Sequence, residues 1–519
     1  MPTELELKLA VRSADLPRLQ IHPRLVQVLA SPPRLQAMRA HYYDTPAGLL
    51  ASHKMSLRVR HEGEGWVQTF KTASGEALAL RQRGEWETPV ASDALDWAAL
   101  AQTPLAELPE FAKLKTRLKR AFTMRFERRS WVLALPTEES PDQPTQAVFS
   151  IDQGEISVGT GARKRTAPLS EVELEHISGK PLPIWKLAQR LCADVALIPL
   201  SSSKAERGWE LLRNVPVAPV KAKPPKLDAQ NCAVQAFAAS VSSPLAALQH
   251  NLRHLQAADV EYVHLARVAL RRLRTVLRAF GPLPECTAHH KSVDAQRGPL
   301  RALGQLLGTA RDADVFALET LPAMRNTLSD EVRNALDTVA HLIALRRTAA
   351  YEAIAIALVQ PAHGQALLRA ERLTYDLATS PDVAHGKKPP RPLLVIANTM
   401  LADAHEKVQH AARDLTRLSP LARHDLRIEV KRLRYLLDLW VKLYTDAQLQ
   451  KYRDALADLQ EELGVINDAA VAGDMLTELQ APQALRDAWQ IEDQRRLIKA
   501  LPRVAQGLAA LDLCPAPWR

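Results

Sequence analysis

The chain has 519 residues, of which 47% are hydrophobic and 24% charged, so it can bury cores and is not a disordered chain. Its 68 Lys and Arg residues exceed its 58 Asp and Glu residues, and the net charge of +10 indicates an anionic partner without identifying it. Aromatic residues make up only 5%, which argues against a surface built to stack nucleic-acid bases.

Several classes of protein are excluded by short segments of the sequence. The first residues have no apolar core, so we expect no signal peptide. No apolar run is long enough to suggest a membrane span. The cysteines at 192, 232, 286 and 514 are too far apart for a disulfide framework or a zinc site, so we expect a reducing cytoplasm.

The residue pattern changes near the middle of the chain. Before residue 215, segments that alternate polar and apolar residues predict β-strands at 4–9, 56–60, 66–71, 78–87, 148–152 and 169–176. A run rich in Pro and Lys follows, and after it apolar residues recur at helical spacing. We therefore predict a strand domain at 1–213, a linker at 214–227 and a helical domain at 228–515.

The helical part contains an internal repeat. A pattern of His, Arg, a basic pair, Leu and Arg in 263–274 recurs in 424–434. The flanking sequence Leu-Gly-x-x-Arg-Asp at 307–312 has the counterpart Leu-Gly-Val-Ile-Asn-Asp at 463–468. This similarity predicts a duplicated unit, with repeats over about 228–370 and 390–515.

Each repeat carries a row of basic residues on one helical face. His264, Arg267, Arg271 and Arg274 form the first row, and His424, Arg427, Lys431 and Arg434 form the second. Like charges stacked in this way repel unless an anion neutralises them, and guanidinium groups match phosphate oxygens. Two such rows would form a basic groove for a repeating phosphate. The alternative is a solvated face, or a face paired with Asp312 and Asp468.

These motifs resemble the CHAD domain, the conserved-histidine α-helical domain, over residues 228–515. The resemblance implies a two-fold bundle of long helices that binds inorganic polyphosphate in a central basic groove. It implies as polyphosphate-binding residues His250, His264, Arg267, Arg271, Arg274, His410, His424, Arg427, Lys431 and Arg434. The second repeat departs from the first, because Lys431 replaces Arg271 and Asn467 replaces Arg311.

The strand part places charges where an ordinary strand would face the core. Glu4, Glu6 and Lys8 share one face of a strand, and leucines occupy the other face. The same alternation recurs at Arg58 and Arg60, and in the runs 83–87 and 171–175. One such strand could be a solvent-facing edge. The whole set predicts a charged interior, and an antiparallel β tunnel or barrel is the simplest fold that provides one.

The chemistry of such an interior follows from its mixed charges. Clustered carboxylates bind hard cations, so Mg²⁺ or Mn²⁺ is the expected cofactor, and clustered Arg and Lys residues bind phosphate oxygens. Together they indicate phosphoryl transfer with a metal-activated water. The sequence has no P-loop motif and no constellation around a nucleophilic Cys or Ser.

A series of motifs in 1–213 resembles the CYTH domain of the triphosphate tunnel metalloenzymes. The motifs are Glu-Leu-Glu-Leu-Lys at 4–8, Tyr-Tyr-Asp-Thr-Pro at 42–46, Leu-Arg-Val-Arg at 57–60, Thr-Phe-Lys at 69–71, Phe-Glu-Arg at 126–128, Asp-Gln-Gly-Glu-Ile at 152–156, Glu-Val-Glu-Leu-Glu at 171–175 and Ser-Lys-Ala-Glu-Arg-Gly at 203–208. The expected fold class is thus α+β multidomain, with an antiparallel β tunnel followed by an all-α bundle.

The resemblance implies a role for individual residues. Metal ligands would be Glu4, Glu6, Glu173, Glu175 and, with less support, Glu171. Triphosphate would contact Lys8, Arg58, Arg60, Lys71, Arg83, Arg128 and Lys204. Catalysis would depend on Glu4, Glu6 and Lys8, with Glu85 and Glu87 facing inward to help position metal or water. Asp44 is expected to support a turn, and Tyr42 and Tyr43 to be structural.

The leading hypothesis is a metal-dependent inorganic triphosphatase whose CHAD domain binds polyphosphate. A second hypothesis keeps the tunnel and changes the substrate to thiamine triphosphate or a nucleoside triphosphate, or the reaction to cyclisation of ATP. A third is a non-catalytic scaffold that binds polyphosphate or nucleic acid, although the few aromatic residues disfavour nucleic acid. No membrane partner is expected, and the predicted location is the cytoplasm, in association with polyphosphate granules.

Overall fold

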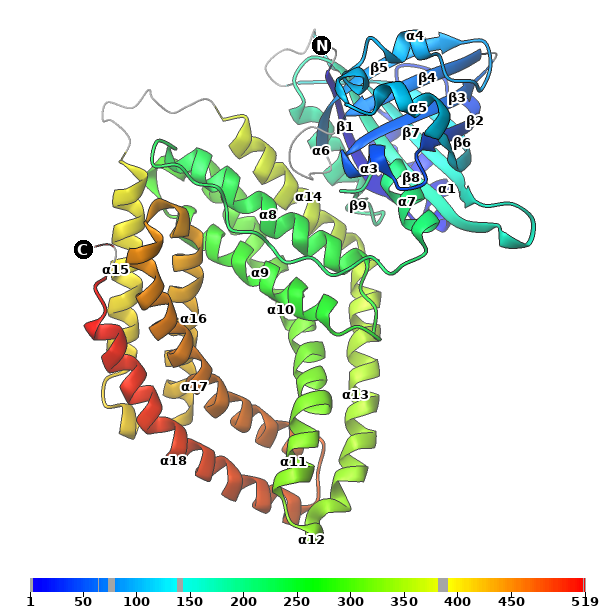
Figure 1. Ribbon diagram of the computed structural model, residues 1–519. Coiled ribbons are helices and arrows are strands. Elements are labelled where there is room, and N and C mark those ends of the chain that lie inside the picture. Colours follow the sequence, from blue (N-terminus) through cyan, green and yellow to red (C-terminus); the bar gives the residue numbers. More distant parts are fainter. Residues whose placement is uncertain are drawn as a thin grey trace. The chain divides into compact units, whose positions relative to one another are not determined.

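The computed structural model describes residues 3–63, 65–72, 80–137, 143–380, 391–516 and 518, and it divides into two compact units (Figure 1). The first unit contains Met1–Ala218 and Leu358–Arg372, and the second contains Pro219–Ala357 and Leu373–Arg519. The side chains of two predicted site residues, Glu4 and Arg83, lie outside the described residues, as does the predicted strand start at residue 78.

Within the described residues, the first unit contains one antiparallel sheet of nine strands. The strands are β1 (Thr3–Ala10), β2 (Arg34–Asp44), β3 (Met55–Glu62), β4 (Gly65–Thr72), β5 (Leu80–Val90), β6 (Lys119–Leu135), β7 (Thr145–Val158), β8 (Arg165–Ser178) and β9 (Ile198–Pro199). Their order is β5-β4-β3-β2-β6-β7-β8-β1-β9. The predicted strands are all present, and the alternation pattern missed β2, β6 and β9.

Strand β1 closes the sheet on itself. On one side it pairs with β8, where Glu6 lies opposite Glu175 and Lys8 opposite Glu173. On the other side it pairs with β5, where Thr3 lies opposite Gly84. Each interior strand therefore has a partner on both sides, and the alternating side chains face either the inside or the outside of a tunnel. This confirms the predicted fold of the strand domain.

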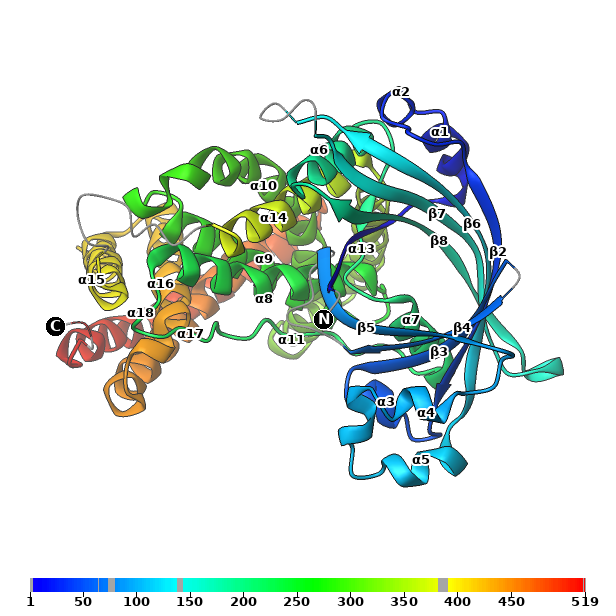
Figure 2. The same cartoon turned by 90° about the horizontal axis from the view of Figure 1, so that it is seen from above.

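Short helices cover the outside of the strands β3 to β5 (Figure 2). These are α3 (Leu49–Ser52), α4 (Trp97–Leu100) and α5 (Phe111–Arg117). Leu50, Leu100 and Leu114 of these helices form one buried core with Leu57 of β3 and Phe70 of β4. The remaining short helices are α1 (Leu16–Gln20), α2 (Pro23–Val26) and α6 (Leu182–Leu191). Apolar side chains thus point outward from these strands, which leaves the polar side chains inside.

Helix α7 (Lys204–Arg213) packs on the inner side of the sheet. It begins with a capping box, in which Ser203 accepts from the Glu206 amide and Glu206 accepts from the Ser203 amide. A Cβ at Gly208 would lie 2.2 Å from the Phe122 ring, so only glycine allows this approach. Trp209 shares a core with Ala40 and Tyr42. This packing sets the first residue of the helix, Lys204, inside the tunnel.

The second unit is built from long helices that occur in the same order twice. The first series is α8 (Ala233–Arg253), α9 (Glu261–Phe280), α10 (His290–Val315) with its continuation α11 (Leu321–Thr327), α12 (Asp330–Arg333) and α13 (Ala335–Leu358). The chain then passes through α14 (Pro361–Ala378), which belongs to the first unit as far as Arg372. The second series is α15 (Leu393–Ala411), α16 (Pro420–Trp440), α17 (Asp446–Glu478) and α18 (Gln483–Leu513). This confirms the predicted repeat. No described helix has the combination of length and hydropathy that crossing a bilayer requires.

The two repeats meet through equivalent residues. Phe280 at the end of α9 and Trp440 at the end of α16 occupy matching positions in the repeat, and their ring centroids are 5.3 Å apart. Phe280 also stacks on Phe237 of α8, at 5.0 Å. This contact is the one expected where a pseudo-two-fold axis relates α9 to α16. A separate buried core, with Phe316, Met324 and Trp489, lies elsewhere in the unit.

Candidate active site and basic stripes

A cavity of about 160 Å³ lies inside the closed sheet, and most of the predicted tunnel residues line it. Strands β1, β3, β4, β5, β6 and β8 and helix α7 supply these residues, which are Glu6, Lys8, Arg58, Arg60, Lys71, Glu85, Glu87, Arg128, Glu173, Glu175 and Lys204. Glu171 is described but does not line the cavity. The side chains of Glu4 and Arg83 lie outside the described residues.

The alternation along β3 explains how the charges reach the cavity. Leu57 and Val59 are fully buried on the outer face, while Arg58 and Arg60 line the cavity on the inner face. Successive side chains of a strand point to opposite faces, so the apolar outer core fixes the direction of both arginines. The same relation places Phe70 outside and Lys71 inside on β4.

One side of the cavity is acidic. Glu6 and Glu175 lie directly opposite each other on β1 and β8, and both line the cavity. Like charges in directly opposite positions destabilise a sheet unless a cation lies between them. Carboxylate oxygens are also the preferred ligands of hard divalent cations. The chemistry and register of this pair therefore fit a bound Mg²⁺ or Mn²⁺.

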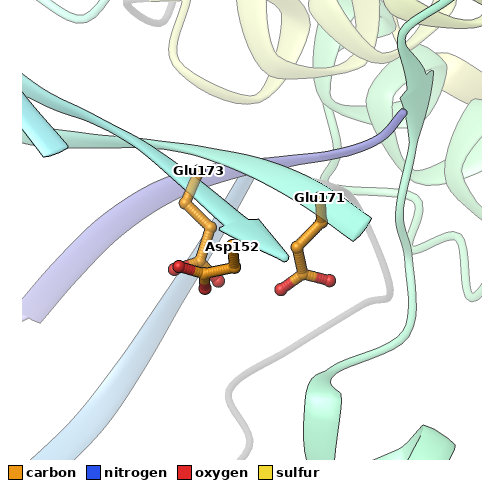
Figure 3. Close-up of side chains that lie close together, drawn as sticks. All are labelled: Asp152, Glu171 and Glu173. Carbon is orange, nitrogen blue, oxygen red and sulfur yellow. The ribbon is translucent and has the colours of Figure 1, made fainter. Parts of the chain in front are cut away.

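Next to this pair lies a buried cluster of three carboxylates. Asp152, Glu171 and Glu173 each offer an oxygen within 4.8 Å of the others (Figure 3). Lys204 bonds to all three, at 2.8 Å from Asp152 and 2.6 Å from Glu173. Arg128 adds two bonds of 2.7 Å to Asp152 and one bond to Glu173, and Arg207 bonds to Glu171. Lys8 Nζ lies 3.2 Å from Glu173, so four cations surround these three carboxylates.

These ion pairs shift the pKa values of the buried groups. Burial alone would raise the pKa of Glu173, but Lys204, Lys8 and Arg128 hold it well below its usual range. Burial alone would lower the pKa of Lys204, but Asp152, Glu171 and Glu173 raise it. Lys8 behaves in the same way, because Glu173 and Glu6 raise its pKa against the effect of burial. Glu173, Lys204 and Lys8 are therefore charged at neutral pH.

The other side of the cavity is basic, with glutamates holding the cations in place. Lys71 Nζ lies 2.8 Å from Glu85 Oε1, and Arg58 lies 3.8 Å from the same oxygen. Arg60 lies 3.0 Å from Glu87, which also accepts a hydrogen bond from Thr69. Glu85 and Glu87 point into the cavity, as predicted, and both form ion pairs with cationic side chains.

Sequence reasoning did not place three residues in the site. Asp152 and Arg207 belong to the buried ion network described above. Tyr42 was expected to be structural, yet it lines the cavity. Burial alone would raise the pKa of Tyr42, but nearby Arg58, Lys204 and Lys71 lower it. The signal available in the sequence was the alternation along β2, where Tyr42 follows the cavity-lining Met38 and Ala40 at a spacing of two.

In the helical unit, the two predicted basic rows come together. We call them the first stripe (His264, Arg267, Arg271 and Arg274, on α9) and the second stripe (His424, Arg427, Lys431 and Arg434, on α16). Burial lowers the pKa of Arg427, and Arg271 and Arg267 of the first stripe lower it further. Arg271 of the first stripe also lies 4.9 Å from the ring centroid of Tyr435, the residue that follows Arg434 on α16. The residues in the middle of the two stripes therefore lie close to one another.

Two acids, one from each repeat, accompany the stripes. Asp468 lies 3.6 Å from Arg427. Burial raises the pKa of Asp312, while Arg267 and Arg427 lower it and Asp468 raises it. Asp312 thus interacts with arginines of both repeats. The alternative interpretation, in which these acids pair with the stripes, therefore holds in part. The two aspartates are nevertheless outnumbered by the six Arg and Lys residues of the stripes.

The predicted histidines occupy equivalent places with different neighbours. His424 Nδ1 lies 3.1 Å from Asn467 Oδ1, while the pKa of His264 is lowered by burial and by Arg311. Arg311 and Asn467 are the positions at which the repeats differ in sequence. His250 and His410 lie in the last turns of α8 and α15, and the His250 ring is 4.9 Å from that of His254.

Comparison with known proteins identifies both parts of the chain. A sequence model of the CYTH domain matches residues 2–209, and one of the CHAD domain matches residues 239–477. The chain therefore belongs to the CYTH family in its N-terminal part and to the CHAD family in its C-terminal part.

Individual relatives agree with this assignment. An inorganic triphosphatase from Haemophilus influenzae is 29% identical over 216 residues, which are 41% of this chain and 55% of that protein. The chain thus spans about half the length of this relative. The CHAD domain from Ricinus communis is 30% identical over 58% of this chain and 98% of that domain, with a TM-score of 0.47.

A further solved structure is that of a Hippeastrum protein described as a putative adenylyl cyclase with a dominant triphosphatase activity. It is 16% identical over 40% of this chain and 95% of that protein, with a TM-score of 0.29. The TM-scores of both solved structures are below 0.5, so the family assignment rests on the two sequence models.

Proposed function

We propose that this protein is a metal-dependent triphosphatase that hydrolyses inorganic triphosphate to pyrophosphate and phosphate, with a CHAD domain that binds polyphosphate. The observation that carries the proposal is the division of one cavity into an acidic side, with Glu6 and Glu175, and a basic side, with Arg58, Arg60 and Lys71. Such a cavity can hold a polyanion and its counter-cation together. The CYTH assignment and the triphosphatase relative support this reaction class.

The metal would be held on the acidic side. Glu6 and Glu175 would be its ligands together with Glu4 and Glu173, because these carboxylates offer the hard oxygens that Mg²⁺ and Mn²⁺ prefer. Glu171 is the weakest of the predicted ligands, because it does not line the cavity, unlike Glu173, although Lys204 bonds to both. When bound, such an ion supplies Lewis-acid stabilisation of phosphate oxygens and lowers the pKa of a coordinated water.

The chain's own residues would bind and orient the triphosphate. Lys8, Arg58, Arg60, Lys71, Arg83, Arg128 and Lys204 are the proposed phosphate ligands, and all but Arg83 have described side chains on the cavity wall. Glu85 and Glu87 hold Lys71 and Arg60 in extended, inward-pointing conformations. Because these cations are already in position, they can stabilise the negative charge that develops on the transferred phosphoryl group without rearranging. The predicted catalytic set is thus Glu4, Glu6 and Lys8, with Glu85 and Glu87 as positioning residues.

The CHAD domain would bind polyphosphate along the two stripes. Their central arginines lie close enough to depress one another's pKa, which means that the unliganded protein bears an electrostatic cost there. A polyanion laid along both stripes would remove that cost. His250 and His410 complete the proposed set at the ends of α8 and α15.

Phosphate release from triphosphate in the presence of Mg²⁺ tests the proposed reaction. We expect rapid release by the full-length protein and a loss of at least about a hundredfold in kcat for Glu6→Gln. Glu127→Gln is the matched control, because this exposed β6 carboxylate pairs with Arg129 outside the cavity. Equal melting temperatures of the variants would show that both are folded. Wild-type turnover by Glu6→Gln would refute the site assignment.

The substrate is tested separately. We expect triphosphate to be hydrolysed in preference to ATP, thiamine triphosphate and long polyphosphate when they compete at equal concentrations. Preference for ATP or thiamine triphosphate would favour the second hypothesis, in which the same cavity accepts an organic triphosphate. Binding of polyphosphate with no hydrolysis of any of the four would favour the non-catalytic scaffold.

A further inference from the structure

The Pro- and Lys-rich linker is bound to the helical unit as an extended strap. Val220 exchanges two hydrogen bonds with the Asn251 side chain of α8, of 2.9 and 2.8 Å. Lys223 exchanges two more with the Ser243 hydroxyl, of 2.8 and 3.0 Å. Arg272 of α9 donates to the Ala222 carbonyl at 2.6 Å, and Ala222 is only 3% exposed. We define residues 220–223 as the strap.

The strap forms one wall of a pocket of about 540 Å³ in the helical unit. The other walls come from α9, α16 and α17. Because strap residues alternate, burial of Ala222 turns the side chains of Lys221 and Lys223 outward, and both line the pocket. The strap thus positions two ammonium groups on a surface made by three helices.

The charges of this pocket are unbalanced. Its cationic side chains are Lys221, Lys223, Arg272, Arg434 and Arg453, and its acids are Asp438 and Asp454. Asp438 is shared between Arg272, at 3.3 Å, and Arg453, at 4.0 Å. Among the described residues, Arg434 and the ammonium groups of the strap have no carboxylate partner. The pocket therefore has more positive charge than its own acids can neutralise.

This pocket extends beyond the stripes. Arg434, the last residue of the second stripe, is the one stripe residue on its wall among the described residues. Arg272 lies next to Arg271 in sequence, and consecutive helical residues point about 100° apart. Lys221, Lys223, Arg272 and Arg453 belong to neither stripe.

We propose that the strap pocket is a second phosphate-binding site, in which Lys221 and Lys223 of the interdomain linker close over a phosphate group held by Arg434, Arg453 and Arg272. Guanidinium groups and ammonium groups are suited to phosphate oxygens, and a pocket of about 540 Å³ has room for a hydrated phosphate. The phosphate group comes either from a polyphosphate chain that also occupies the second stripe or from free orthophosphate. This proposal extends the polyphosphate-binding part of the proposed function and does not depend on catalysis.

Chemical footprinting of the strap lysines tests the proposal. Full-length protein in EDTA, where metal-dependent turnover is blocked, is acetylated with and without orthophosphate, tripolyphosphate or long polyphosphate, and each lysine is quantified by mass spectrometry. Lys226 is the internal control, because it is exposed in the same linker but does not line the pocket. We expect acetylation of Lys221 and Lys223 to slow by roughly threefold or more relative to Lys226.

The probe that protects Lys221 and Lys223 from acetylation identifies the source of the phosphate. Protection by orthophosphate assigns the site to free phosphate, and protection by the polymers alone assigns it to polyphosphate. Arg453→Gln should reduce the protection, whereas Arg503→Gln, an exposed α18 arginine paired with Glu462, should leave it unchanged. The proposal is wrong if no probe protects Lys221 and Lys223 more than Lys226, or if Arg453→Gln leaves the protection intact.

A binding measurement separates this site from the stripes. The double variant Lys221→Gln/Lys223→Gln should bind long polyphosphate roughly three- to tenfold more weakly and reduce the slope of log affinity against log salt by about two, while Lys226→Gln changes neither. Arg267→Gln/Arg427→Gln reports on the stripes alone. If this stripe variant no longer binds polyphosphate but orthophosphate still protects the strap lysines, the strap pocket binds phosphate independently of the stripes. An unchanged affinity and slope in the strap variant would overturn the polyphosphate form of the proposal.

Discussion

Lys204 Nζ lies 2.8 Å from Asp152 Oδ2, and the Asp152 carboxylate is completely buried beneath the tunnel. The two residues come from the start of α7 and the middle of β7, and Arg128 forms two further bonds to the same carboxylate. A buried carboxylate with two cationic partners fixes the position of both. Asp152 therefore holds in place two of the cations that are proposed to contact triphosphate.

Replacement of Asp152 by Asn should destabilise the tunnel. Removing one partner of a buried ion pair leaves uncompensated charge, so we expect a loss of about 3 kcal/mol or more in the free energy of unfolding of the first unit. Denaturant unfolding followed by tryptophan fluorescence measures the change. Glu155→Gln, which removes an exposed ion pair with Lys164, is the control and should cost at most about 1 kcal/mol. Equal effects of the two substitutions would contradict the structural role of Asp152.

Replacement of Gly208 by Ala should displace α7. The new Cβ would lie 2.2 Å from the Phe122 ring, so the helix or the ring must move, and we expect a cost of about 1–3 kcal/mol. Because α7 carries Lys204 into the cavity, the KM for triphosphate should also rise. Gly65→Ala is the control, because a Cβ there meets no atom within 4 Å. A Gly208→Ala variant with unchanged stability and KM would show that α7 does not need this close approach.

Replacement of Glu175 by Gln should weaken metal binding. It removes one of two carboxylates that face each other across β1 and β8, so we expect the Mg²⁺ concentration for half-maximal phosphate release to rise by about tenfold or more. Calorimetric titration with Mn²⁺ provides a second measurement that is independent of turnover. EDTA should abolish the activity of the wild-type protein, and Mg²⁺ should restore it. A metal requirement equal to that of Glu127→Gln would exclude Glu175 as a ligand.

Lys431 should make polyphosphate binding depend on pH. Burial, together with Arg427 and Arg271, lowers the pKa of Lys431 to about 7, and Arg267 acts in the same direction while Asp468 opposes it. The side chain is thus charged below pH 7 and increasingly neutral above it, so affinity should fall as the pH rises from about 6 to about 8, by at most about tenfold per unit.

The variant Lys431→Arg isolates this effect. An arginine stays charged over this range, so the affinity of Lys431→Arg should decline less with pH than that of the wild type. The comparison also removes the titration of the terminal phosphates, which is common to both proteins. Lys499→Arg on α18 is the control for a lysine outside the stripes. Parallel pH profiles for wild type and Lys431→Arg would show that Lys431 does not titrate in the complex.

The tunnel interior was predictable because local sequence alone dictates it. Arg58 and Arg60 alternate with Leu57 and Val59, and once the leucine and valine are buried outside, the arginines can only face inward. The buried partners of these cations were less visible. Asp152 follows three apolar residues and one serine on β7, and it meets Lys204 only because α7 folds back inside the sheet.

The strap was not predictable for a related reason. The prolines around it are typical of a stiff linker, and the alternation at 220–223 is too short to indicate an extended segment. Its partners, Asn251 and Ser243, are polar residues of α8. The sequence does not indicate which segment packs against them. By contrast, the duplication was predictable, because the spacing of His and Arg residues survives in both repeats.

The contact between Phe280 and Trp440 has a consequence for how a polymer can enter the helical unit. A polyphosphate chain has no chemical direction, because its two ends are the same. A binding surface generated by a two-fold axis has none either, since a half-turn exchanges α9 with α16. A polyphosphate chain bound along both stripes, as proposed, would therefore find similar contacts from either end. Lys431 and Asn467, where the repeats have diverged, and the strap beside Arg434 of the second stripe would distinguish the two directions.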